Sequence, residues 1–143
     1  MTKILKINPA APEPSRIKEA ADVIRRGGTV AFPTETVYGL GADALNPEAI
    51  KKVFKAKGRP SDNPLIVHIS DMDTFQLVAK KPVKAAIDLI NRFWPGPLTI
   101  IVKKKKIVGK VHVGIFDHDS SFLSKSVLKN KLFFFSISIG LFG

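Results

Sequence analysis

Short apolar runs alternate along this chain with segments of helical period, and this alternation restricts the fold more than any other feature. Each run has the length of a strand, and the segments between them carry apolar residues three and four positions apart, as a helix with one buried face does. Strands that alternate with helices predict a layered α/β domain. The predicted strands are 29–32, 65–69 and 98–102, and the predicted helices begin at Ser15, Asn46 and about Pro82 and end at Gly27-Gly28, Gly58 and Phe93.

Capping chemistry sets these helix boundaries. Ser15 is a good N-cap because its hydroxyl can accept a hydrogen bond from the first turn. Asn46 followed by Pro47 is typical of an N-cap and a first helical residue, and Gly58 is placed to end that helix. The apolar faces of the three helices are predicted to be Ile17, Ala20, Ala21 and Ile24; Ile50, Val53 and Phe54; and Val83, Ala86, Ile87 and Ile90.

Length and composition describe an ordinary single domain. A chain of 143 residues can bury about two thirds of its unfolded surface. No apolar run reaches the ~18 residues of a membrane span, and the start lacks signal-peptide anatomy. Cysteine is absent, which excludes disulfides, thiolate metal sites and a cysteine nucleophile. We therefore expect a cytoplasmic protein with no membrane partner.

The net charge of +11 is unevenly distributed. Residues 1–102 hold 15 Lys or Arg and 10 Asp or Glu, whereas residues 103–143 hold 8 and 2. A basic excess favours polyanions such as nucleotides or RNA as partners, but a solvated lysine-rich surface gives the same excess.

The pattern changes after residue 103. Lys103–Lys106 is a charge run, 111–116 has the composition of one more strand, and 132–139 is apolar without polar periodicity. Such a tail fits a buried β segment, or it fits a reading-frame error or truncation, and we favour the second interpretation. An exposed run of this kind would be an aggregation hazard.

Two groups of polar residues are candidate ligand contacts. Thr34, Thr36 and Tyr38 alternate, so that one extended strand would direct three hydroxyls to the same side. Lys57 and Arg59 follow a helix, where they could face a phosphate. The ordinary alternatives are a turn that satisfies its own backbone and a solvated helix end.

Asn63 and His68 are weaker signals. Asn63 precedes Pro64, and Asn-Pro more often starts a turn than holds a ligand. His68 interrupts an apolar strand, where a histidine is more often part of the core. No dinucleotide fingerprint or Walker sequence is present, which disfavours both common nucleotide-binding folds.

Read in order, five separated blocks resemble the threonylcarbamoyl-AMP synthase family, whose domain is called YrdC-like. The resemblance covers about residues 10–107, and the blocks are Pro33-Thr34-Glu35-Thr36-Val37-Tyr38-Gly39-Leu40, Lys57-Gly58-Arg59-Pro60, Asn63-Pro64-Leu65, His68 and Trp94-Pro95-Gly96-Pro97-Leu98-Thr99. It implies an α/β fold with a twisted, open, mixed sheet flanked by helices, as in YrdC/RibB-like domains, and a concave, positively charged cavity.

The resemblance also implies a reaction. A nucleotidyltransferase of this family makes threonylcarbamoyl-AMP and pyrophosphate from L-threonine, bicarbonate and ATP, for N6-threonylcarbamoylation of an adenosine in tRNA. The carboxylated threonine amine attacks the α-phosphorus, so no protein nucleophile is needed. Mg²⁺ would arrive with ATP, and tRNA and the downstream threonylcarbamoyl transferase machinery would be partners.

The resemblance implies that the two groups of polar residues are two halves of one binding site. Lys57 and Arg59 would hold the phosphates and the bicarbonate-derived carboxylate, with Asn63 at the nucleotide. Thr36 and His68 would hold threonine. Thr34 and Tyr38 would shape the threonine pocket.

The chain departs from the family pattern after residue 107. Phe116 stands where an arginine-bearing strand is expected, and 136–140 lacks the asparagine of a Ser-Ala-Asn segment. We therefore expect residues 1–107 to be the N-terminal part of the domain, residues 108–143 to be divergent or aberrant, the fold to be incomplete at its C-terminal end, and the enzyme to be weak or inactive. The alternatives are a basic RNA- or tRNA-binding module without catalysis and a carbamoyl-transfer piece of a hydrogenase-maturation enzyme, which the missing cysteines disfavour.

Overall fold

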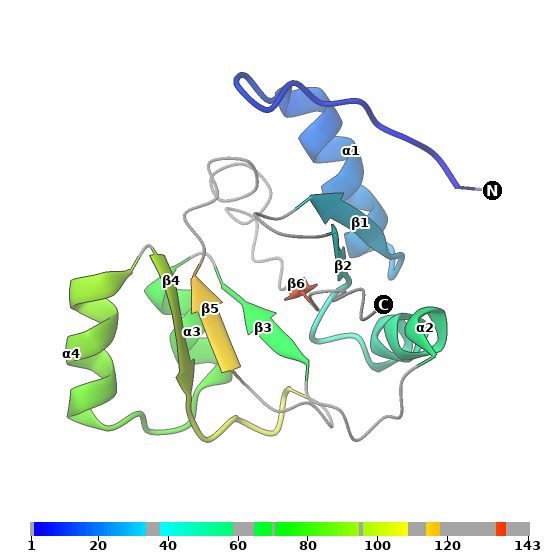
Figure 1. Cartoon of the computed structure of the whole chain (residues 1–143). Helices are drawn as coiled ribbons and strands as arrows, with labels where there is room; N and C mark the ends of the chain where they lie inside the picture. Colours follow the sequence, from blue (N-terminus) through cyan, green and yellow to red (C-terminus); the bar gives the residue numbers. More distant parts are fainter. Residues whose placement is uncertain are drawn as a thin grey trace, which may run out of the picture.

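The computed structural model describes residues 2–33, 38–58, 65–69, 71–94, 96–108, 114–117 and 134–136. Four helices and six strands lie in this part of the chain (Figure 1). In chain order they are α1 Pro14–Arg25, β1 Val30–Pro33, β2 Tyr38–Gly41, α2 Pro47–Lys57, β3 Ile66–His68, α3 Met72–Val78, α4 Lys84–Phe93, β4 Gly96–Ile101, β5 Gly114–Asp117 and β6 Phe134–Ser136.

The strands form two sheets. β1 and β2 are an antiparallel pair, in which Pro33 is aligned with Tyr38 and Phe32 with Gly39. The other four strands form a mixed sheet in the order β4-β5-β3-β6, with β3 parallel to β5 and antiparallel to β6. β2 also contacts β6, so the hairpin lies beside one edge of the larger sheet (Figure 1). The predicted α/β fold with a mixed sheet flanked by helices is confirmed.

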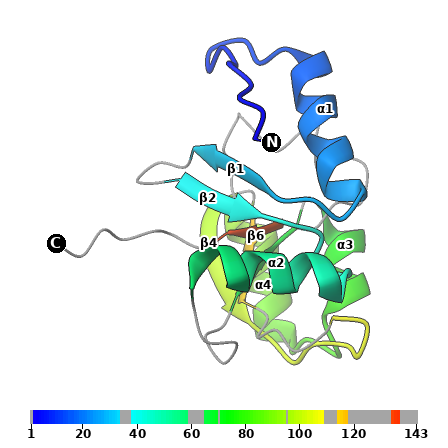
Figure 2. The same cartoon turned by 90° about the vertical axis from the view of Figure 1, so that its right-hand side faces the viewer.

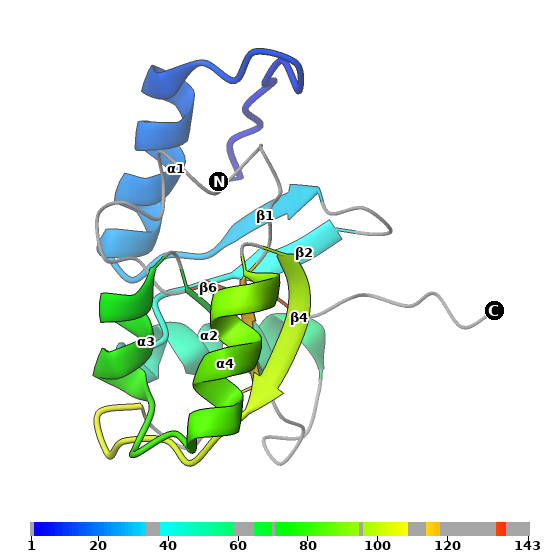
Figure 3. The same ribbon diagram turned by 90° about the vertical axis from the view of Figure 1, so that its left-hand side faces the viewer.

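Two apolar clusters hold these layers together. The smaller one joins α1 to β1 through Ile17, Ala21, Ile24 and Phe32. The larger one lies between the four-stranded sheet and helices α2, α3 and α4, with α3 and α4 packed side by side (Figure 3). Its largest fully buried side chains are Phe75, Leu65, Ile69, Ile90, Val53, Val67, Val78 and Val108.

The boundaries of α2 are as predicted. The Asn46 side chain accepts hydrogen bonds from the backbone N–H groups of Glu48 at 3.0 Å and Ala49 at 3.2 Å, and Pro47 is the first helical residue. Gly58 ends the helix in the left-handed conformation with φ 59°, which glycine adopts without a steric penalty.

The start of α1 corrects the sequence prediction. The helix begins at Pro14 with Glu13 as N-cap, and no side chain caps it, so the expected Ser15 cap is wrong. Proline is pre-organised for the first helical turn and needs no hydrogen-bond acceptor there. The N-cap is therefore Glu13, two residues before the expected Ser15. The helix ends as expected, and Gly27 follows it with φ 72°.

The start of α4 also differs from the prediction. The helix begins at Lys84 rather than near Pro82, and Val83 is an N-cap that is 70% exposed instead of part of the buried face. Ala86 and Ile90 are buried as expected. Trp94 follows α4 and contacts both β4 and α3. Its indole N–H donates to the Leu98 carbonyl of β4 at 2.9 Å, and its ring packs edge-on against the Phe75 ring of α3 with the ring centroids 5.9 Å apart.

The three predicted strands are present, and the structure adds a strand and a helix that were not predicted. The strands predicted at 29–32, 65–69 and 98–102 correspond to β1, β3 and β4. β2 and α3 were not predicted, and α3 is capped by the Asp71 carboxylate, which accepts from the Thr74 N–H at 2.7 Å. In the part of the chain that is described, no helix has both the length and the apolar character needed to cross a membrane.

Candidate functional site

The end of α2 supplies the cationic part of the candidate site. Lys55 is exposed and Lys57 is half-buried in the last turn, where the negative end of the helix dipole favours positive side chains. Gly58 then sets the direction in which the chain leaves the helix. Arg59 and Asn63, the two other predicted phosphate and nucleotide contacts, lie outside the described residues.

The β1–β2 hairpin supplies the hydroxyl part. Tyr38 is the first residue of β2 and is 63% exposed. Because Pro33 and Tyr38 are aligned in an antiparallel pair, the chain reverses direction between them. Thr34 and Thr36 lie outside the described residues, so the predicted row of three hydroxyls with Tyr38 stays a prediction.

One end of the β1–β2 hairpin and the C-terminal end of α2 lie on the same side of the molecule. In Figures 2 and 3, the end of the hairpin that carries Pro33 and Tyr38 lies on the same side as the C-terminal end of α2. The hairpin thus brings Tyr38 to the side of the protein on which α2 delivers Lys57, although the two residues are 19 positions apart in the sequence.

His68 occupies the central sheet. It is the last residue of β3 and is half-buried, between the fully buried Val67 and Ile69. Its register partners are Phe116 on β5 and Phe134 on β6. Because β6 pairs with β3 and also contacts β2, it links the strand that ends in His68 to the strand that begins with Tyr38.

β5 and β6 come from the segment that departs from the family pattern. Both strands pair with β3, one on each side. Phe116, at the position where the resemblance leads us to expect arginine, is aligned with His68 and with Thr99 of β4. β5, Gly114–Asp117, overlaps the second half of the strand expected at 111–116, and residues 111–113 lie outside the described residues.

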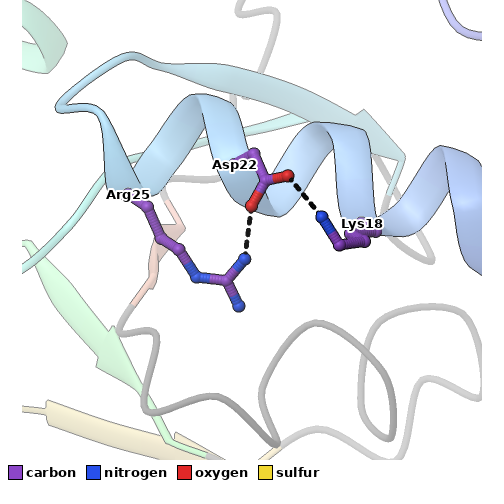
Figure 4. A network of polar contacts seen from close by, with 3 residues as sticks. All are labelled: Lys18, Asp22 and Arg25. Carbon is purple, nitrogen blue, oxygen red and sulfur yellow. Dashed lines mark hydrogen bonds and ion pairs between the residues drawn. The ribbon is translucent and has the colours of Figure 1, made fainter.

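Acidic groups with a displaced pKa are found on and beside α1. The Lys18 ammonium, donating to Asp22 at 3.0 Å, and the Arg25 guanidinium, donating at 2.5 Å, hold the pKa of the Asp22 carboxyl below its usual value (Figure 4). Backbone N–H groups of Glu13 itself and of Asn8 lower the pKa of the Glu13 carboxyl. The hydrogen-bond partners of both carboxylates lie on or beside α1, and neither carboxylate is among the residues of the candidate site.

One feature was not predicted from the sequence. The pairing of residues 78–80 with 103–105 brings two separate groups of lysines together, and only the run at 103–106 had been noted. Metal binding has no candidate ligand set in the described ranges, where no three His, Asp or Glu side chains group together.

Comparison with known proteins gives a consistent result. The family model Sua5/yciO/yrdC, described as telomere recombination, matches residues 22–121. A threonylcarbamoyl-AMP synthase of Pyrococcus abyssi is 49% identical over 117 residues, which are 82% of this chain and 34% of that protein. A threonylcarbamoyl-AMP synthase of Bacillus subtilis is 53% identical over 90 residues, which are 63% of this chain and 26% of that protein.

Solved structures agree with these relatives. The crystal structure of P. abyssi Sua5 complexed with L-threonine superposes with a TM-score of 0.78 at 41% identity, covering 90% of this chain and 39% of that one. E. coli YciO has a TM-score of 0.77 at 21% identity, over 100% of this chain and 72% of that one, and supports the fold alone. The chain thus spans about a third or less of the two curated synthases.

Proposed function

The chain belongs to the Sua5/YciO/YrdC family, and from this we propose that it is the N-terminal part of an L-threonylcarbamoyladenylate synthase. The observation that carries the proposal is the 49% identity with the P. abyssi synthase over 82% of this chain. The substrates are L-threonine, bicarbonate and ATP, with Mg²⁺ bound to ATP. The products are threonylcarbamoyl-AMP and pyrophosphate.

In the proposed reaction, threonine and bicarbonate first give a carbamate on the threonine nitrogen: an N–C bond forms, a C–O bond of bicarbonate breaks, and the hydroxyl leaves as water with a proton of the amine. A carbamate oxygen then forms a bond to the α-phosphorus of ATP, and the bond from that phosphorus to the bridging oxygen of the pyrophosphate group breaks. The protein has to align these groups and neutralise the charge that leaves on pyrophosphate. It does not need a nucleophile of its own.

The side chains proposed for these tasks come from three elements. Lys57, at the end of α2, and Arg59 bind the phosphates and the carbamate carboxylate, and Asn63 binds the nucleotide. Thr36 and His68 bind threonine. Support for this division is the placement of Lys57 and Tyr38 on the same side of the molecule (Figures 2 and 3), and Thr34 and Tyr38 complete the threonine pocket.

We further propose that residues 1–107 carry the N-terminal part of the domain and that residues 108–143 are a divergent segment. Phe116 replaces the expected arginine at a position aligned with His68, so one cation of the ligand shell is missing. Turnover should therefore be slow. The product would serve tRNA modification through a separate threonylcarbamoyl transferase, as expected of a cytoplasmic enzyme.

The direct test is pyrophosphate release by the purified chain. Release should require ATP, L-threonine and bicarbonate together, and Lys57→Ala should lower it about a hundredfold if the lysine stabilises the departing charge. Lys51→Ala, a charge change on the exposed surface of the same helix, is the matched control and should behave as the parent chain.

Slow turnover makes a binding measurement necessary beside the activity assay. Calorimetry should detect L-threonine and ATP binding to the folded chain even where pyrophosphate release is small. A folded chain that binds neither ligand would refute the proposal. RNA binding that is steeply salt-dependent and unchanged by Lys57→Ala and Arg59→Ala, in a chain without pyrophosphate release, would instead favour the non-catalytic RNA-binding module.

A further inference from the structure

Five exposed lysines gather at the end of the molecule opposite α1. They lie on the connection between α3 and α4 and on the segment that follows β4, which meet at this end in Figures 1 and 3. We call them the lysine patch: Lys80, Lys81, Lys103, Lys105 and Lys106.

Backbone pairing brings the two parts of the lysine patch together. Ala79 and Lys104 form an antiparallel bridge, flanked by hydrogen bonds from the Lys80 N–H to the Lys103 carbonyl at 2.6 Å and from the Lys105 N–H to the Val78 carbonyl at 2.7 Å. Lys80 is therefore directly opposite Lys103. Ala79 is buried, and because neighbouring residues in an extended segment point to opposite faces, Lys80 and Lys103 point outward.

This arrangement is unfavourable for the free protein. Like charges directly opposite one another across an antiparallel pair are destabilising. In the described part of the chain, none of the five ammonium groups is ion-paired with a carboxylate, because the ion pairs there join residues of the N-terminal segment, α1, α2 and α4. The Lys105 ammonium donates to the Gln76 backbone carbonyl at 2.6 Å.

Backbone strain adds to the charge repulsion. Lys81 has φ 44°, and among the described residues it is the one residue other than glycine with a positive φ. Non-glycine residues in this conformation are uncommon, and they occur most often where the strained geometry serves a function. A solvated loop would be better served by glycine or asparagine at this position.

We propose that the lysine patch binds the phosphate backbone of RNA, at a surface separate from the candidate active site. Ammonium groups bind phosphates as point charges, and a cluster of lysines on paired segments offers several of them to the phosphates of a polyanion at once. The patch lies on a turn and two extended segments rather than on the amphipathic helix that a membrane surface usually binds. The choice of RNA over DNA rests on the proposed function.

Binding of a fluorescein-labelled RNA stem–loop, followed by fluorescence anisotropy, tests the proposal. The triple variant Lys80→Gln, Lys103→Gln, Lys106→Gln should lower the affinity at least about tenfold at about 50 mM salt, and it should reduce the slope of log affinity against log salt by roughly two to three. The matched control removes three exposed lysines elsewhere, at Lys6, Lys18 and Lys51. It should stay within about twofold of the parent, because salt screens distant charges.

A second variant separates function from structure at the strained residue. Lys81→Gly should keep or raise the thermal midpoint, since glycine relieves the positive φ, while it lowers RNA affinity about threefold by removing one phosphate contact. A purely structural lysine would not produce these opposite changes.

Several results would overturn the proposal. They are a parent chain that does not bind the RNA, equal losses in the two triple variants, and patch-dependent binding to phosphatidylserine vesicles but not to RNA. The patch variants should retain the parent's pyrophosphate release. A parent without release or substrate binding would refute the proposed function and leave the patch-dependent binding of RNA intact.

Discussion

Replacing Gly58 with alanine should destabilise the chain through the backbone alone. Gly58 ends α2 at φ 59° and ψ 24°, and a Cβ added there would meet no atom within 4 Å. The left-handed conformation costs an L-residue about 1–2 kcal/mol, whereas the stiffer unfolded chain of the alanine variant returns about 0.4–1 kcal/mol. The free energy of unfolding should therefore fall by about 1 kcal/mol.

Thermal and urea unfolding followed by circular dichroism measure this loss. A change of about 1 kcal/mol corresponds to about 3–5 °C in the thermal midpoint for a chain of this size. Gly58→Asn is the matched control because asparagine tolerates the left-handed conformation, and it should lose less than half as much. An alanine variant as stable as the parent, or an asparagine variant less stable than the alanine one, would refute the reasoning.

The same substitution tests the link between the end of α2 and the site. Gly58 stands between Lys57 and Arg59. A changed backbone conformation at this end of α2 should therefore misdirect the proposed phosphate contacts and weaken ATP binding. Asn46→Ala removes the N-cap of the same helix, and it should cost a similar free energy of about 1 kcal/mol without touching this end. Equal losses of ATP affinity in the two variants would mean that stability alone, and not the direction of the chain at Gly58, controls binding.

Three further substitutions have defined outcomes. Asp22→Asn should lower the thermal midpoint at neutral pH, and this effect should disappear in acid as the folded carboxyl becomes protonated. The pKa of this carboxyl is depressed in the folded protein, so its contribution to stability is complete above the unfolded pKa of about 3.9 and is lost as the pH falls through the folded value; a difference that persists after the carboxyl has protonated would contradict this. Val53→Ala should reduce the free energy of unfolding by about 2 kcal/mol in urea titrations, since the side chain is fully buried and leaves a cavity; a loss below about 0.5 kcal/mol would show that the core closes around the gap. Phe116→Arg should strengthen ATP binding measured by calorimetry, because it restores a cation aligned with His68, whereas Phe116→Leu should not; equal effects of the two changes would contradict the missing-cation argument.

Local chemistry explains which elements could be predicted from the sequence. α2 was predicted at both ends because its N-cap, its proline and its final glycine each act on their own neighbours. The start of α1 was misplaced because two local signals compete there, and the proline prevails over the serine. α3 was missed although Asp71 is a good N-cap. A helix of seven residues has only about two turns, which are too few to show a helical repeat of apolar residues in the sequence.

Pairing partners that are distant in the sequence decide the structure of the hairpin and of β6, so local residue patterns do not determine these elements. β2 contains Gly39 and Gly41, which weaken the strand signal, and its structure depends on alignment with β1. β6 is a strand because β3 offers it an edge 66 positions earlier in the chain, as the alignment of His68 with Phe134 shows. A sequence pattern carries little information about such distant partners.

The candidate site divides in the same way. The sequence identified Tyr38, Lys57 and His68 as separate signals, each with an ordinary alternative reading. β6 links the strand that begins with Tyr38 to the strand that ends in His68, because it contacts the hairpin and pairs with β3.

The lysine patch shows why pairing also matters for function. Lys80-Lys81 and the run at 103–106 are each ordinary solvated sequences when considered alone. Only the bridge between Ala79 and Lys104 puts Lys80 opposite Lys103, and only the φ of Lys81 shows that a lysine stands where glycine would be easier. Repulsion and strain at one place are unfavourable for a free surface, and a bound polyanion relieves the repulsion. If the patch had no anionic ligand, neutral replacements there should stabilise the protein with no loss of RNA binding, whereas we expect Lys81→Gly to lower the RNA affinity while it keeps or raises the thermal midpoint.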